Sequence, residues 1–171
     1  MLNATGFSLM TPSLARIHAT LHLQGGAAGN AMSGIRILIA DDHAVVRECL
    51  SRMIDDQPDM RLVAEASDGE SASNAAVSCK PHVAILDVRM PGRGCVAAIR
   101  RMREKSPSTR VLVLSMYDDP HYVSAALAAG AHAYLSKRTS SADLIATIRR
   151  LYEGASLANC LSSADFVRSR S

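Results

Sequence analysis

Five polar side chains stand just after short apolar segments of the sequence, namely Asp41, Asp42, Asp87, Ser115 and Lys137. If those segments are parallel strands, their carboxyl ends meet at one edge of a sheet and the five side chains gather there. Three carboxylates at close range repel one another, and they stay ionised together when a cation offsets their charge. Carboxylate oxygens are hard ligands, and His43 is the only histidine or cysteine beside them. This donor set favours Mg²⁺ over zinc.

The same residues could carry out phosphoryl transfer. An aspartate held beside Mg²⁺ is a nucleophile for a phosphoryl group, and the product is an aspartyl phosphate. Lys137 adds a second positive charge and Ser115 a hydroxyl donor. Taken singly, an aspartate after a strand is usually a cap or turn residue, a lysine is usually solvated, and a serine is common in turns. Their joint occurrence after four different segments favours the chemical role.

The apolar segments that position these side chains have the length and composition of buried strands. We expect strands at 35–40, 61–66, 82–86, 111–114 and 133–135. Apolar residues at helical spacing fill the intervals, and Asp119-Pro120 and Gly130 are typical helix start and end signals. The pattern predicts an α/β fold: a doubly wound five-stranded parallel sheet of flavodoxin-like order 2-1-3-4-5.

A single domain at 33–154 accounts for this pattern in a chain of 171 residues. Residues 1–32 hold one charged residue and a Gly/Ala-rich stretch, so we expect a disordered and dispensable leader. A short amphipathic helix at 14–23 that docks on the domain is the alternative. Initiation at Met32 would remove the leader altogether. The Ser-rich residues 155–171 are expected to form a short tail.

Composition limits the class of protein. With 48% hydrophobic and 20% charged residues the chain is ordinary for a globular protein, and no apolar run approaches the length of about 18 residues that a membrane span needs. The start of the chain lacks the features of a secretion signal, so we expect a cytoplasmic protein. A net charge of +3 is too small to indicate a nucleic-acid partner. Four cysteines without metal-ligand spacing indicate reduced thiols.

Four motifs carry a resemblance to a known family. They are ILIADDHAVVRECL at 37–50, AILDVRMPGRG at 84–94, VLVLSMYDDPHYVSAALAAGAHAYLSK at 111–137 and YEGAS at 152–156. Together they make the domain similar to the receiver domain of bacterial two-component response regulators. The segments ADDH, LSMYDD and AHAYLSK are most similar to the NarL/LuxR-type subfamily.

The resemblance implies a role for each motif residue. Asp87 resembles the phosphoacceptor, which a sensor histidine kinase phosphorylates. The implied Mg²⁺ ligands are Asp41, Asp42, Asp87 and the backbone carbonyl of Arg89, with Asp42 as the direct ligand of the acidic pair. The residues implied to contact or follow the phosphoryl group are Ser115, Lys137 and Tyr134.

The resemblance also implies how such a domain works. It is a signalling domain and not an enzyme, although it takes part in its own phosphorylation and dephosphorylation. Phosphorylation is expected to switch a protein-interaction surface built from the fourth helix, the fifth strand and the fifth helix. A homodimer formed there, or through neighbouring helices, is a further expectation.

Two features depart from the family pattern. Cys95 stands where the family usually has glycine, and Gly94 lies one residue early. We expect Cys95 to pack in the core, with a thiol near the site as the alternative. NarL-type regulators also carry a C-terminal helix-turn-helix of about 25 residues, and residues 155–171 are too few for one. We expect a stand-alone receiver without direct DNA contact; a truncated DNA-binding transcriptional regulator is the alternative.

Two other classes of α/β protein fit poorly. Phosphatases of the haloacid-dehalogenase type need a second acid two residues after the nucleophile, where this chain has Arg89. Nucleotide-binding domains need a glycine-rich loop after the first strand, where this chain reads ADDHAV. Neither pattern is present.

Overall fold

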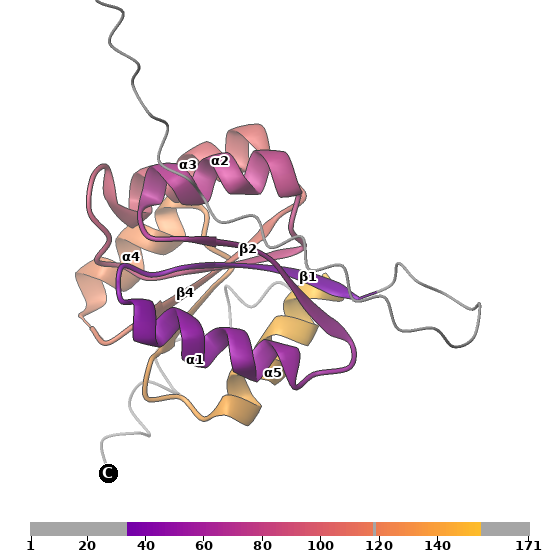
Figure 1. Cartoon of the computed structure of the whole chain (residues 1–171). Coiled ribbons are helices and arrows are strands. Elements are labelled where there is room, and N and C mark those ends of the chain that lie inside the picture. Colours follow the sequence, from indigo (N-terminus) through magenta and orange to yellow (C-terminus); the bar gives the residue numbers. More distant parts are fainter. Residues whose placement is uncertain (1–33, 118, 155–171) are drawn as a thin grey trace, which may run out of the picture.

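The computed structural model describes residues 34–117 and 119–154, in which strands and helices alternate along the chain. The five strands are β1 (Ile35–Ala40), β2 (Met60–Ala66), β3 (Val83–Leu86), β4 (Arg110–Ser115) and β5 (Ala133–Ser136). The five helices are α1 (Ala44–Asp55), α2 (Gly69–Cys79), α3 (Gly94–Lys105), α4 (Pro120–Ala129) and α5 (Ser141–Tyr152). Figure 1 shows a central sheet with helices on both sides.

The strands pair in parallel in the order β2-β1-β3-β4-β5. This order confirms the predicted doubly wound, flavodoxin-like sheet. The strand bounds differ from the predicted ones by one residue at several ends. β4 and β5 each extend one residue farther because Ser115 and Ser136 still pair in the ladder, whereas His82 lies just before β3.

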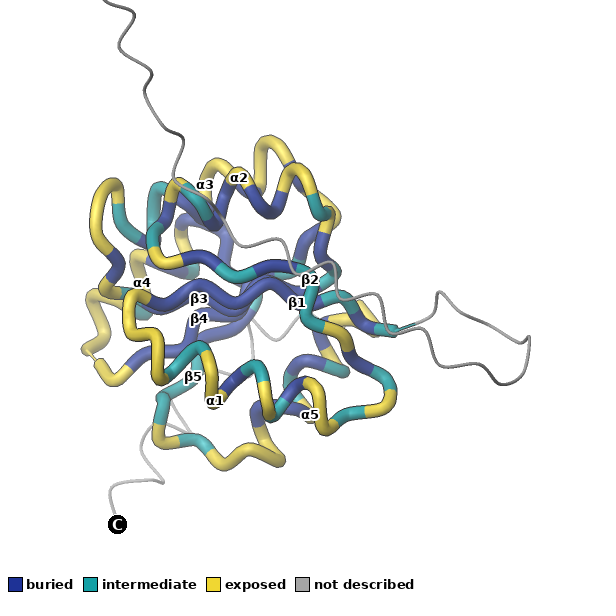
Figure 2. Tube along the Cα trace, viewed as in Figure 1, coloured by how far each residue is buried: buried dark blue, intermediate teal, exposed yellow. Residues whose placement is uncertain are grey.

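The sheet separates two apolar cores. Alternate side chains of a strand point to opposite faces, so Ile37 and Ile39 pack with α1 and α5, whereas Leu38 and Ala40 pack with α2, α3 and α4. Figure 2 shows the buried residues in the strands and on the inner sides of the helices. The inner strands are therefore covered on both faces, which explains their nearly continuous apolar sequence.

Capping residues fix where three of the helices begin. The side chain of Asp68 accepts hydrogen bonds from two main-chain N–H groups at the start of α2, and Asp119 and Ser140 cap α4 and α5. Gly130 ends α4 with a φ of 109°, a left-handed conformation that glycine adopts without strain. The predicted start and end of this helix are confirmed.

Close packing of α2 against α3 positions the loop that follows β3. A Cβ atom at Gly69 would lie 2.8 Å from the main-chain oxygen of Gly94, so only glycine allows this approach. The buried face of α2 consists of small residues, Ala72, Ala75 and Ala76 among them. The first turn of α3 is thereby held against α2.

Several predictions concern residues beyond this domain. The expected leader at 1–32, its alternative helix at 14–23 and the tail at 155–171 lie outside the described residues, so they stay predictions. Within 34–117 and 119–154 no helix is both long and apolar enough to cross a bilayer. The three cysteines in these ranges, Cys49, Cys79 and Cys95, form no disulfide.

Candidate functional site

The carboxyl ends of β1, β3, β4 and β5 bring the predicted residues to one edge of the sheet. This carboxyl rim comprises Asp41, Asp42, Asp87, Ser115 and Lys137. The main-chain N–H of Asp87 donates to the carbonyl of Ala40 over 2.8 Å, which keeps the ends of β1 and β3 in register. The N–H of Lys137 donates to the carbonyl of Ser115 over 2.7 Å in the same way for β4 and β5. Strand pairing thus determines which side chains meet.

Lys137 lies between two buried carboxylates. Its Nζ atom is 2.5 Å from Oδ2 of Asp41 and 3.0 Å from Oδ1 of Asp87. Asp41 is 2% exposed and Asp87 6%, so water screens these contacts little. Burial alone would lower the pKa of Lys137, but the hydrogen bonds and charges of both carboxylates outweigh burial and raise its pKa. The side chain is therefore a full ammonium charge at neutral pH.

The second carboxylate oxygen of Asp87 accepts from the main chain. The N–H of Arg89 donates to Oδ2 over 2.9 Å. The carboxylate is consequently held from both sides, by Lys137 and by the loop that follows β3. Such contacts fix the orientation of a carboxylate that is to act as a nucleophile.

The acidic pair after β1 meets a histidine. One potential ligand atom from each of Asp41, Asp42 and His43 lies within 4.8 Å of the others. Nδ1 of His43 is 2.8 Å from Oδ1 of Asp42, and the His43 main-chain N–H donates to Oδ1 of Asp41 over 2.9 Å. Asp41 is buried, whereas Asp42 and His43 are open to solvent. The carboxylate of Asp42 is therefore accessible to solvent.

The donor chemistry of the carboxyl rim fits Mg²⁺. The Lys137 ammonium contacts Asp41 and Asp87, and Asp42 adds a third carboxylate beside Asp41, so the excess of negative charge favours a bound cation. The donors are mainly carboxylate oxygens, which suit a hard divalent ion. The solvent-accessible Asp42 allows such an ion to keep water ligands, as Mg²⁺ usually does.

Ser115 and Tyr134 meet the same stretch of main chain. Ser115 is fully buried, and its Oγ accepts from the N–H of Tyr117 over 3.1 Å. Tyr134 is 3% exposed, and its hydroxyl donates to the carbonyl of Tyr117 over 2.6 Å. Among the described residues, no hydrogen bond joins the Ser115 hydroxyl to the side chain of Asp87 or Lys137. The two predicted switch residues therefore both bind the main chain of Tyr117, in the loop that follows β4.

A cluster of exposed side chains beside the rim was not predicted from the sequence. The guanidinium of Arg89 donates to the hydroxyl of Tyr117 over 2.7 Å and lies 5.2 Å from its ring centroid. The ring of Tyr122 is 5.9 Å from that of Tyr117. The hydrogen bond to Tyr117 raises the pKa of Arg89. An aromatic residue two positions after Ser115 is the only signal of this cluster in the sequence.

Cys95 packs in the core, as expected. It is 4% exposed, in the cluster formed by α2, α3 and α4. Burial, together with the nearby charge of Asp87, raises the pKa of its thiol to about 12. Cys95 is thus close enough to Asp87 to be affected by its charge, yet it stays a neutral thiol.

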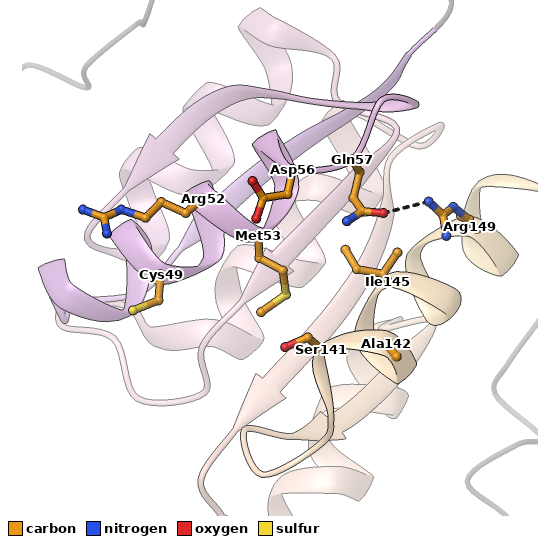
Figure 3. A pocket seen from close by; sticks show the side chains of 9 residues that line it. All are labelled: Cys49, Arg52, Met53, Asp56, Gln57, Ser141, Ala142, Ile145 and Arg149. Carbon is orange, nitrogen blue, oxygen red and sulfur yellow. Dashed lines mark hydrogen bonds between the residues drawn. The ribbon is translucent and has the colours of Figure 1, made fainter.

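A separate hollow of about 650 Å³ lies between α1 and α5, on the face of the sheet that these two helices cover. Figure 3 shows Met53 and Ile145 facing each other across it, with Arg149 hydrogen-bonded to Gln57 at one end. The remaining lining residues are Cys49, Arg52, Asp56, Ser141 and Ala142. None of them belongs to the carboxyl rim, so this hollow takes no part in the site.

The fold and the carboxyl rim define a class of domain in which a carboxylate, a lysine and an acidic pair meet at the end of a doubly wound sheet. Residues 37–149 match the model of the response regulator receiver domain. The chain belongs to this family, and it is a receiver domain of the NarL/NreC type from two-component systems. It is a signalling domain, as predicted; receiver domains in general bind Mg²⁺ at their acidic pocket.

Named relatives give the same assignment. The chain is 40% identical to the oxygen regulatory protein NreC of Staphylococcus epidermidis over 121 residues. This alignment covers 70% of this chain and 56% of NreC. The chain thus spans about half the length of the curated relatives that it matches. The signal receiver domain of the response regulator NarL from Mycobacterium tuberculosis is 31% identical, with a TM-score of 0.69 over 72% of this chain and 99% of that one.

A further solved structure is the isolated receiver domain of RcsB from Salmonella enterica serovar Typhimurium, in the presence of the phosphomimetic BeF₃⁻. It is 25% identical, with a TM-score of 0.65 over 72% of this chain and 91% of that one.

Proposed function

We propose that Asp87 accepts a phosphoryl group from the phosphohistidine of a sensor histidine kinase. The observation that carries this proposal is the position of Lys137, whose Nζ contacts the carboxylates of both Asp41 and Asp87. One cation between two buried carboxylates is an arrangement that binds an added anionic group once a divalent ion supplies further positive charge. Receiver domains of this family interact with histidine kinases, which supports the choice of donor.

The residues that would hold Mg²⁺ are Asp41, Asp42, Asp87 and the backbone carbonyl of Arg89. The buried Asp41 and Asp87 and the accessible Asp42 supply the excess of negative charge that favours such an ion. When bound, the ion offsets the charge on the phosphoryl oxygens and on the attacking carboxylate.

The transfer itself needs little covalent chemistry from the protein. A lone pair on an Asp87 oxygen forms the new bond to phosphorus as the bond from phosphorus to the donor nitrogen breaks. The imidazole of the donor leaves with that electron pair. Lys137 orients Asp87 before the transfer and pairs with a phosphoryl oxygen afterwards, while Ser115 turns its hydroxyl toward the same group.

The proposed switch extends from Ser115 to the surface of α4, β5 and α5. If the Ser115 hydroxyl turns toward the phosphoryl group, its bond to the N–H of Tyr117 is lost. The Tyr117 carbonyl also accepts from Tyr134, so a shift of this loop changes the surroundings of that ring. We propose that this change alters the α4-β5-α5 surface, with a homodimer formed there or through neighbouring helices.

This surface proposal has its own test. Sedimentation of the protein with BeF₃⁻ and Mg²⁺ should give a larger mass than sedimentation with Mg²⁺ alone at high protein concentration. An unchanged mass would argue against dimerisation driven by phosphorylation.

The remaining parts of the proposal concern location and nucleic acid. Free thiols at Cys49, Cys79 and Cys95 suit the reducing cytoplasm, where we place the protein. We assign no direct DNA contact to residues 34–154, because the whole chain has a net charge of only +3.

The proposal is tested by phosphorylation with acetyl phosphate. The unmodified protein should gain one phosphoryl group, seen in its intact mass, with Mg²⁺ and none with excess chelator. Asp87→Asn should gain none. Asp55→Asn, which removes an exposed carboxylate of α1, is the matched control and should behave as the unmodified protein. Undiminished labelling of Asp87→Asn would refute the assignment. RcsB, whose isolated receiver domain has a solved structure in the presence of BeF₃⁻, provides a comparison protein for this assay.

A further inference from the structure

Two histidines at the amino-terminal edge of the sheet make the same unusual pair of contacts. His82 directly precedes β3 and His132 directly precedes β5. Each uses its main chain and its ring together to bind one residue of the neighbouring strand. We call them the edge histidines. They lie at the end of the strands opposite the carboxyl rim.

His82 joins β3 to β1. Its main-chain N–H donates to the carbonyl of Arg36 over 2.8 Å, and its ring Nδ1 accepts from the N–H of Arg36 over 3.1 Å. The ring thus takes the place that a strand carbonyl would hold in the ladder. Because Nδ1 must be unprotonated to accept, the proton of the neutral ring is on Nε2.

His132 joins β5 to β4 with the same geometry. Its N–H donates to the carbonyl of Val111 over 2.8 Å, and Nδ1 accepts from the N–H of Val111 over 3.1 Å. Two positions separated by fifty residues of chain thus extend two different strand pairs by the same two hydrogen bonds. The repetition indicates a defined structural device and not an accident of one loop.

The groups around the edge histidines oppose a positive charge on either ring. Arg36 of β1 places a positive charge near His82, and the aromatic ring of Tyr152 on α5 packs 4.9 Å from the His82 ring. Arg110 of β4 and Arg103 of α3 face His132. Among the described residues, no carboxylate lies within ion-pair distance of either ring. A protonated imidazole would therefore lose its acceptor atom and gain no counter-charge.

These surroundings have the same effect on both rings. Burial, and then the charge of Arg36, lower the pKa of His82. Burial lowers the pKa of His132, and the charges of Arg110 and Arg103 lower it further. In the unfolded chain a histidine has a pKa of about 6.5. At a pH just below 6.5 the unfolded chain therefore binds more protons than the folded one, so stability falls as the pH falls.

We propose that the edge histidines form an acid-sensitive device: their ring contacts extend the β1-β3 and β4-β5 ladders at neutral pH and are lost in acid, which weakens both strand pairs. The consequence reaches the carboxyl rim through the strands. β1 and β3 end at Asp41 and Asp87, and β4 and β5 lead to Ser115 and Lys137. Each histidine therefore supports one pair of strands whose far ends carry the site.

The local test follows each ring and its bound amide by NMR in the full chain. The imidazole signals of His82 and His132 should titrate with midpoints below about 6.5, the value of an ordinary histidine. The amide protons of Arg36 and Val111 should shift with the same midpoints. Midpoints at or above 6.5, or amide shifts that do not follow the rings, would overturn the proposal.

The global test uses asparagine, whose Oδ1 atom accepts a hydrogen bond from nearly the position of Nδ1 but does not titrate. Urea unfolding is compared at pH 7.5 and pH 5.5. When the pH is lowered from 7.5 to 5.5, the unfolding equilibrium constant of the unmodified chain should increase. This increase should be about tenfold larger than the increase for the double variant His82→Asn/His132→Asn. Equal rises in the two proteins would contradict the proposal.

His121→Asn is the matched control, because His121 is exposed on α4 and its ring makes none of these contacts. This variant should keep the pH dependence of the unmodified chain. If the double variant fails to fold, the NMR midpoints of the unmodified protein decide the question alone. Neither measurement involves phosphorylation, so its outcome is independent of the function proposed above.

Discussion

The hydroxyl of Tyr134 donates a hydrogen bond of 2.6 Å to the main-chain carbonyl of Tyr117, and so links β5 to the loop that follows β4. Ser115 accepts from the N–H of the same residue, so both polar groups of the Tyr117 main chain are bound by predicted switch residues. The ring of Tyr117 in turn contacts Arg89 outside the site. Tyr117 thus connects the buried switch positions Ser115 and Tyr134 with the exposed side chain of Arg89.

Tyr134→Phe should destabilise the protein by about 1 kcal/mol, because the Tyr117 carbonyl loses a buried donor while the ring stays in place. Urea unfolding at pH 7.5 measures this loss. Tyr122→Phe is the control, since Tyr122 is 43% exposed and contacts Tyr117 through its ring. A Tyr134→Phe variant as stable as the unmodified protein would show that the bond contributes nothing.

Lys137→Met should leave the carboxylates of Asp41 and Asp87 buried without a cation between them. We expect the free energy of unfolding to fall by about 3 kcal/mol in the absence of divalent ions, because two buried carboxylates then have no positive charge to offset the cost of their burial. Mg²⁺ should recover more stability in this variant than in the unmodified protein. Thermal unfolding with and without Mg²⁺ measures both effects. The exposed Lys105→Met is the control, and equal responses to Mg²⁺ would count against the electrostatic account.

Cys95 should resist alkylation in the folded protein. With its pKa raised to about 12, few of its thiols are ionised at pH 8, whereas the exposed Cys49 has no such burial. We expect iodoacetamide to modify Cys95 at least about a thousandfold more slowly than Cys49 until urea unfolds the chain. Peptide mapping separates these sites from Cys79 and Cys160. Similar rates for Cys95 and Cys49 would contradict its burial.

The same shift gives the thiol a pH dependence. A raised pKa means that the stabilisation from the neutral buried thiol is complete below the ordinary value of 9.0 and is lost as the pH rises toward 12. Replacement by alanine should therefore reduce the loss of stability between pH 8 and pH 10.

Gly130→Ala should destabilise the end of α4 for two reasons. The residue has a φ of 109°, and an added Cβ would lie 1.9 Å from Cδ of Arg103. We expect a loss of about 1–2 kcal/mol in urea unfolding. Gly130→Ala combined with Arg103→Ala removes the contact but not the backbone strain, so it should recover only part of the loss. Full recovery would show that strain is negligible.

The sequence predicted the strands and the rim because both depend on local pattern. Apolar runs ending in Asp41, Asp87 and Ser115 are read directly, and parallel pairing then brings their ends together. The subfamily resemblance was likewise carried by contiguous motifs. The position of Cys95 in the core followed from its thiol being a small apolar group.

The features that the sequence did not predict are contacts between distant side chains. Arg89 and Tyr117 meet only because β3 and β4 are neighbours and their loops have particular conformations. The packing of Arg103 over Gly130 depends on the angle between α3 and α4. The contacts of His82 and His132 were not predicted, because a lone histidine at the start of a strand gives no sign of what its ring binds. Such contacts are set by tertiary geometry, which no local periodicity encodes.

Phosphorylation of Asp87 is best tested by locating the phosphoryl group on the chain. After reaction with acetyl phosphate and Mg²⁺, borohydride reduces an aspartyl phosphate to homoserine, and peptide mass spectrometry finds the converted position. We expect conversion at Asp87 alone, with Asp41 and Asp42 unchanged, and no conversion without Mg²⁺. Conversion at another aspartate, or at Asp87 in the absence of any divalent ion, would contradict this expectation.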